Sequence, residues 1–140
     1  MPPPPKRKEN RLKNRDIYTG ALKILSERVE IGTSEDYEER APYLIAAFCC
    51  ECAEADRVYR RARSLPAAKA VNDVYVDLSA DFACSSRFST AACMYLASML
   101  VIDEDPELSD KLFDKYSDIM SAICAELPAQ IEAISDKYVY

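Results

Sequence analysis

The chain has 140 residues, a net charge of −6, no histidine and only two glycines. Few glycines leave few positions for tight hairpin turns, so multi-stranded antiparallel folds are disfavoured, and the length suits one compact domain. Without histidine the commonest general base is missing, and no apolar run approaches the roughly 20 residues of a membrane span. We therefore expect no enzyme and no membrane protein.

Charge and proline set the first 15 residues apart from the rest. They contain six of the 18 basic residues and four consecutive prolines, a composition typical of a flexible tail. The remainder carries 12 basic and 23 acidic groups, a charge of −11 that should repel nucleic acid. The sequence therefore predicts a tail over residues 1–15, either simply solvated or touching nucleic acid or an acidic neighbour, and a helical domain over residues 16–140.

Helical spacing of apolar residues predicts a first helix over residues 17–29, with Gly32 as its stop. Residues 33–40 predict a short helical turn, because hydroxyls followed by carboxylates favour a helix start. Pro42 fits the first turn of a helix, so either a new helix or a kinked continuation is expected there. This second long helix should end before Pro66.

Residues 64–86 lose the helical period, and we expect an extended loop. Within it Val74, Val76 and Leu78 alternate with polar neighbours, as in a strand that is simply extended or that pairs with another chain. We take Val74, Tyr75 and Val76 as candidate interaction residues.

Ser85 or Ser86 is expected to cap a third helix that reaches about Ile102. Asp105 as N-cap and Pro106 at the first helical position then begin a fourth helix, which should lie antiparallel to the third. Beyond Pro128 the apolar pattern resumes over residues 131–138, which predicts a kinked or restarted terminal helix. The predicted fold class is thus all-α: a single-domain bundle of four to five helices.

Two aromatic residues near the C-terminus, Tyr138 and Tyr140, are further candidates for interaction. Large aromatic side chains at a chain end favour docking onto another surface. Packing on the chain's own core explains them equally well.

Six cysteines are present, three of them in the sequence CCEC at residues 49–52. Adjacent thiols on a helix point in different directions, unlike the paired spacing of zinc or redox motifs. We interpret the cysteines as buried reduced thiols, with a zinc or redox module as the competing hypothesis. The acidic residues 103–107 lack the glycine and glutamate spacing of a calcium loop, and there is no glycine-rich phosphate loop. We predict no catalytic residue, no cofactor and no metal.

The order of segments resembles a known family of small helical proteins. The peptides that carry the resemblance are IYTGALKIL (17–25), ERAPYLI (39–45), CCEC (49–52), RFSTAA (87–92), YLASMLVIDEDPEL (95–108) and FDKY (113–116). This layout resembles the head–tail connector, or adaptor, proteins of tailed phages and of prophages of Gram-positive bacteria. It covers roughly residues 17–120 and is most specific over residues 88–116.

The resemblance implies a helical virion protein that assembles as a homo-oligomeric ring below the portal, joining capsid to tail and continuing the DNA channel. Its partners would be copies of itself, the portal protein and tail-completion proteins, with DNA only passing through. Its place would be the virion, and the host bacterial cytoplasm during assembly. No catalysis is implied. The alternative is a small bacterial helical adaptor or regulator that binds one protein partner.

Overall fold

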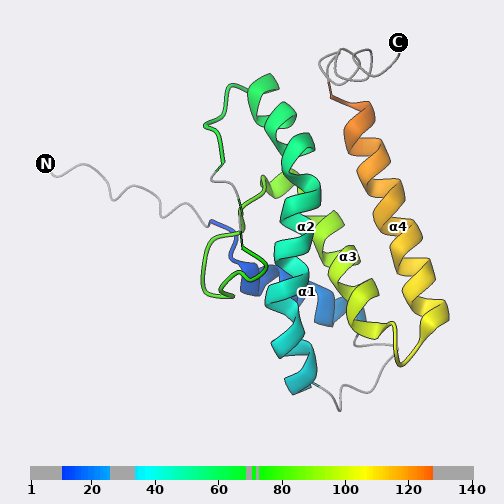
Figure 1. Ribbon diagram of the computed structural model, residues 1–140. Helices are drawn as coiled ribbons and strands as arrows, with labels where there is room; N and C mark the ends of the chain where they lie inside the picture. The colour runs from blue at the N-terminus through cyan, green and yellow to red at the C-terminus, as the bar shows by residue number, and fades with distance from the viewer. Residues whose placement is uncertain (1–10, 26–33, 69–70, 72, 128–140) are drawn as a thin grey trace, which may run out of the picture.

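The computed structural model describes residues 11–25, 34–68, 71 and 73–127. Its elements are α1 (Asn14–Leu25), α2 (Ser34–Ala62), a short 3-10 helix η1 (Ser86–Phe88), α3 (Ser89–Val101) and α4 (Pro106–Ala125). Figure 1 shows them as an all-helical bundle, and the described residues contain no strand beyond one isolated bridge between Lys13 and Asp81. The predicted all-α class is confirmed.

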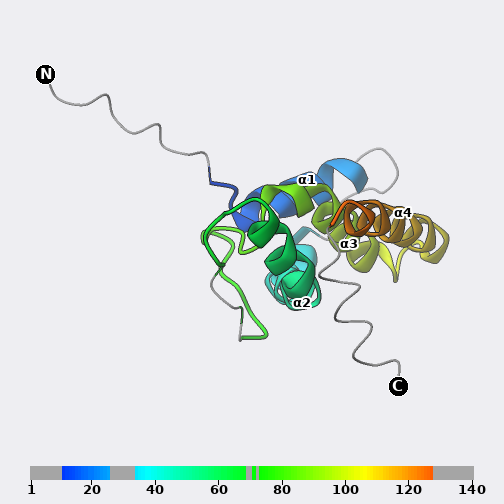
Figure 2. The same cartoon turned by 90° about the horizontal axis from the view of Figure 1, so that it is seen from above.

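Helix α3 forms the centre of the bundle because α1, α2 and α4 all pack against it. Its 13 residues include no charged side chain, which is typical of a helix that is surrounded on all sides. Figures 1 and 2 show α2 and α4 on either side of α3 and α1 crossing behind them. The core is therefore organised around the most apolar segment of the sequence.

The connection between α3 and α4 has the predicted form. The Asp105 side chain accepts a hydrogen bond from the Leu108 amide at 3.0 Å, and Pro106 occupies the first turn of α4. A second pair of polar contacts joins the helices themselves: the Ser98 and Ser109 hydroxyls each donate to the carbonyl of the other residue, at 3.0 and 2.9 Å. Both serines are buried, and their small side chains let the two helices approach closely.

Helix α2 runs without interruption from Ser34 to Ala62 and includes Pro42. The separate turn predicted for residues 33–40 is thus the first part of this long helix. A proline removes one hydrogen bond of the helix ladder. Here Pro42 is buried against the protein, and its carbonyl also accepts from the Val76 amide at 3.3 Å, so tertiary contacts offset the local cost.

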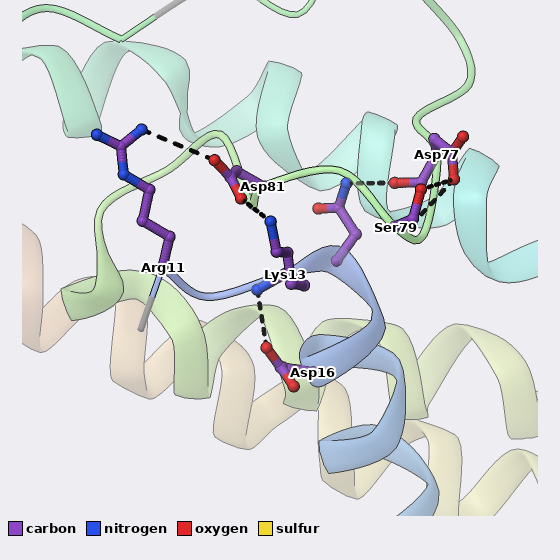
Figure 3. A network of polar contacts seen from close by, with 7 residues as sticks. Arg11, Lys13, Asp16, Asp77, Ser79 and Asp81 are labelled. Carbon is purple, nitrogen blue, oxygen red and sulfur yellow. Dashed lines mark hydrogen bonds and ion pairs between the residues drawn. The ribbon is translucent and has the colours of Figure 1, made fainter. Parts of the chain in front are cut away.

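Helix α1 begins at Asn14, so the predicted tail boundary at residue 15 is too late. Residues 12–15 pair with the loop at residues 78–82: the Asn14 and Arg15 amides donate to the Ala80 and Leu78 carbonyls, and Phe82 donates to Leu12. Figure 3 shows the accompanying side chains, including the ion pair of Lys13 with Asp81. Of the basic residues assigned to the tail, Arg11 and Lys13 pair with the Asp81 carboxylate, and the Arg15 amide donates to the Leu78 carbonyl.

The start of α3 differs from prediction. Ser85 lies at the N-cap of η1, but its hydroxyl makes no capping hydrogen bond and is buried without a partner. Its amide instead donates to the buried carboxylate of Asp56 on α2 at 2.9 Å. Ser85 is thus held by the Asp56 carboxylate of α2, and not by a hydrogen bond from its own hydroxyl to the following helix.

The helix expected over residues 131–138 and the last residues of the helix expected over 17–29 lie outside the described residues.

The core itself is rich in aromatic contacts. Phe48 of α2 packs against Phe82, Tyr95 and Tyr116 with ring centroids 5.8–6.2 Å apart. These rings join α2, α3, α4 and the loop into one core.

Candidate interaction surface

The residues between α2 and η1, numbered 63–85, form the connecting segment, of which residues 63–68, 71 and 73–85 are described. In Figure 1 it lies beside α2, in green. Because its described residues form no helix or strand, their position depends on contacts with the helices. Those contacts decide which of its side chains reach solvent.

One set of contacts comes from a charged pair in the second half of α2. The Asp56 and Arg60 side chains are 4% and 19% exposed and lie 2.8 Å apart. The Arg60 guanidinium also donates to the Pro66 carbonyl at 3.1 Å and to the Ala83 carbonyl at 3.2 Å. With the Ser85 amide bound to Asp56, this pair holds both ends of the connecting segment against α2.

A second set of contacts holds the turn at residues 77–81 (Figure 3). The Asn14 side chain donates to the Asp77 carbonyl at 2.9 Å, and the Asp77 carboxylate accepts from the Ser79 amide and hydroxyl. Hydrogen bonds from Ser79 lower the pKa of Asp77, and the hydrogen bond from Lys13 lowers the pKa of Asp81. Both carboxylates therefore stay charged at neutral pH and keep the turn in place.

Between these anchors, three apolar side chains remain exposed. Val74 is 79% exposed, Tyr43 of α2 54% and Tyr75 48%. The two tyrosine rings pack edge to face with their centroids 5.3 Å apart. We call these three residues the Tyr43–Tyr75 surface. The Val76 amide donates to the Pro42 carbonyl, so the backbone directly after Tyr75 is held against the helix that carries Tyr43.

The surface has a charged border. A shallow cavity of about 540 Å³ next to it is lined by Tyr43 and Tyr75 together with Arg15, Glu38 and Glu39. Arg15 and Glu38 are paired at 3.2 Å. An apolar centre with a polar border is the usual anatomy of a protein–protein interface.

The structure separates the residues predicted for interaction. Val74 and Tyr75 lie on the surface, whereas Val76 is half-buried against the core because its amide is bound to the Pro42 carbonyl. Leu78 is buried whereas Val74 is exposed, so the three alternating residues do not share one side, and the described part of this stretch forms no strand. Tyr138 and Tyr140 lie outside the described residues.

Tyr43 was not among the predicted candidates. Its neighbours Ala41 and Ile45 are buried, so helical spacing alone places Tyr43 on the opposite, outward side of α2. A large aromatic residue on an exposed helix face was therefore a usable signal. Its pairing with Tyr75, 32 positions further along the chain, was not visible in the sequence.

The cysteines are distributed as helical geometry requires. Cys49, Cys52 and Cys84 are buried, Cys50 is exposed, and all six residues are free thiols. A hydrogen bond with Cys84, together with burial, raises the pKa of Cys49 well above its ordinary range. Within the described ranges, no group of three or more Cys, Asp or Glu side chains is placed to hold a metal ion.

No family model matches the chain, and neither a curated protein nor a solved structure matches it. In the part of the chain that the structure describes, none of the helices combines the length and apolar character that a bilayer crossing demands. Fold and site together define a helical protein with an ordered apolar patch on its surface.

Proposed function

We propose that this chain is a non-enzymatic structural subunit of a tailed-phage virion, a head–tail connector or adaptor. Copies of the chain assemble as a ring below the portal, join the capsid to the tail and continue the DNA channel. The observation that carries the proposal is the Tyr43–Tyr75 surface, an exposed aromatic patch on an anchored loop of an otherwise charged helical protein. The resemblance over residues 17–120 supplies the biological setting.

The physical argument starts from the cost of exposing such a patch. Covering apolar surface contributes about 25 cal/mol per Å², and Tyr side chains are enriched at the centres of interfaces. The anchoring contacts of Asp56, Arg60 and Asn14 mean that little ordering entropy is lost when the patch is covered. A preformed apolar patch of this kind supports docking onto another protein.

The acidic charge of the chain supports the same setting. Residues 16–140 carry −11, and a surface of that charge does not adhere to the phosphates of DNA that passes through a channel. The basic residues Arg11, Lys13 and Arg15 are engaged by acidic side chains of the chain itself. In this role DNA only passes through the channel, and the protein does not bind a specific DNA sequence.

Light scattering coupled to size exclusion tests the proposal. The wild-type chain should form a large species at high concentration or when mixed with a phage portal protein. Tyr43→Ser combined with Tyr75→Ser should abolish that species and leave the circular dichroism spectrum unchanged. Ile102→Ser is the matched control, because Ile102 is 46% exposed on the turn after α3 and does not belong to the Tyr43–Tyr75 surface.

Two results would contradict the proposal. One is a wild-type chain that stays monomeric both at high concentration and with the portal protein. The other is assembly that the tyrosine variants leave unchanged.

The alternative, a bacterial adaptor for a single protein partner, predicts a one-to-one complex and no ring. Genes for a portal and a major capsid protein next to this one would favour the connector.

A further inference from the structure

A second cavity, of about 610 Å³, opens between the second half of α2 and the connecting segment. Its buried lining includes Cys49 and Cys84, and its exposed lining includes Arg57, Arg61 and Leu65. We call it the arginine pocket. A volume of this size is typical of sites for small molecules.

The walls of the arginine pocket are mostly apolar. Four alanines contribute to them, at positions 53, 67, 68 and 83, with Val71 and Leu65. The two thiols on the buried side are protonated at neutral pH. A hydrogen bond with Cys84 and burial raise the pKa of Cys49. The hydrogen bond with Cys49 lowers the pKa of Cys84, but a hydrogen bond with Cys52 and burial raise it more. The interior therefore suits an uncharged hydrocarbon or aromatic group.

The charged residues of the arginine pocket are not equivalent. Arg60 is committed to Asp56 and to two backbone carbonyls, and both Asp56 oxygens are occupied by Arg60 and the Ser85 amide. Arg57 is paired with Glu54, which does not line the cavity. Among the described residues no ion pair involves Arg61. Because Glu54 holds the Arg57 guanidinium at two points, the net positive charge at the border comes from Arg61.

This charge stands out against the acidic protein around it. A chain with −11 over residues 16–140 repels anions in general, so an anion site needs local cations. The C-terminal end of α2 carries partial negative charge, so the helix dipole does not supply the attraction. The Arg61 guanidinium supplies this attraction for anions, because a guanidinium binds carboxylates through paired hydrogen bonds.

From these features we infer that the arginine pocket binds small amphipathic carboxylates, with the apolar part among the alanines and the carboxylate on Arg61. The described wall opposite α2 is held in place, because Arg60 binds the carbonyls of Pro66 and Ala83. Little reorganisation is then required on binding. The inference does not depend on the proposed role in assembly.

Calorimetric titration of the purified full-length chain with octanoate tests the inference, and octanamide serves as the neutral analogue of the same length. Octanoate should bind with one site per chain, and octanamide at least about tenfold more weakly. Arg61→Gln should weaken the binding of octanoate by a similar factor. Ala53→Phe, which fills the cavity from its exposed side, should weaken both compounds.

Arg63→Gln is the matched control, since Arg63 lies over the Tyr59 ring and does not line the arginine pocket. It should bind octanoate within about twofold of wild type, and circular dichroism should show every variant folded. No binding of octanoate by the wild type overturns the inference. So does equal binding of octanoate and octanamide, or an equal loss of affinity in the Arg63→Gln and Arg61→Gln variants.

Discussion

Removal of the Asp56 carboxylate should destabilise the protein more than any substitution of an exposed charge. In Asp56→Ala the guanidinium of Arg60, 19% exposed, loses its ion-pair partner, and the Ser85 amide loses its acceptor. Breaking a buried pair in this way costs about 3–5 kcal/mol. Because Arg60 keeps some water and two carbonyl acceptors, we expect the lower end, about 3 kcal/mol.

Thermal unfolding followed by circular dichroism measures this loss. At this chain length, 1 kcal/mol corresponds to roughly 3 °C, so the melting temperature should fall by about 10 °C. Asp56→Asn should lie between wild type and Asp56→Ala, because an amide oxygen can still accept from Ser85. Glu54→Ala removes a carboxylate from the neighbouring exposed pair and should leave the melting temperature nearly unchanged.

The double variant Asp56→Leu with Arg60→Met shows whether the unpaired charge or the lost packing causes the lower stability of Asp56→Ala. Without Asp56 the remaining cost comes from an unpaired buried guanidinium, so replacing Arg60 as well should recover most of the stability. A fall of less than 1 °C in Asp56→Ala would refute the reasoning. A double variant that is no more stable than Asp56→Ala would also refute it.

Three further predictions concern other contacts. Gly20→Ala should destabilise the protein although alanine favours helices, because its Cβ would lie 2.6 Å from the Cys93 sulfur; adding Cys93→Ala should restore stability in urea unfolding. The lowered pKa of Asp81 means that its ion pairs stabilise the fold above its ordinary pKa of 3.8 and are lost as pH falls below it. The stability difference between wild type and Asp81→Asn should therefore be present at pH 6 and shrink towards pH 2, and a constant difference would contradict this. In native protein Cys50 should react with iodoacetamide first and Cys49 only after denaturation, as mass spectrometry of peptides can show.

The helices were predictable because their signals are local. Apolar spacing and the Asp105–Pro106 start identify α4, and the charge-free segment that becomes α3 is recognisable from composition. The exposure of Val74 and Tyr75 was also within reach of the sequence. Each of these features depends on residues within a few turns of one another.

Other features depend on contacts between residues far apart in the chain. The continuity of α2 through Pro42 and the half-burial of Val76 follow from one contact, the hydrogen bond that joins them. The order of residues 12–15 follows from carbonyls and carboxylates more than 60 positions away. No local propensity encodes these partners.

The sequence by itself determined the all-α class, the main helices and an acidic, histidine-free surface, because periodicity, capping and composition act over short distances. Only the tertiary structure decided that Tyr43 meets Tyr75, that Asp56 and Arg60 hold the connecting segment, and that apolar walls and arginines meet in one pocket. Those arrangements arise because the packing of all the helices in the core determines which distant side chains become neighbours.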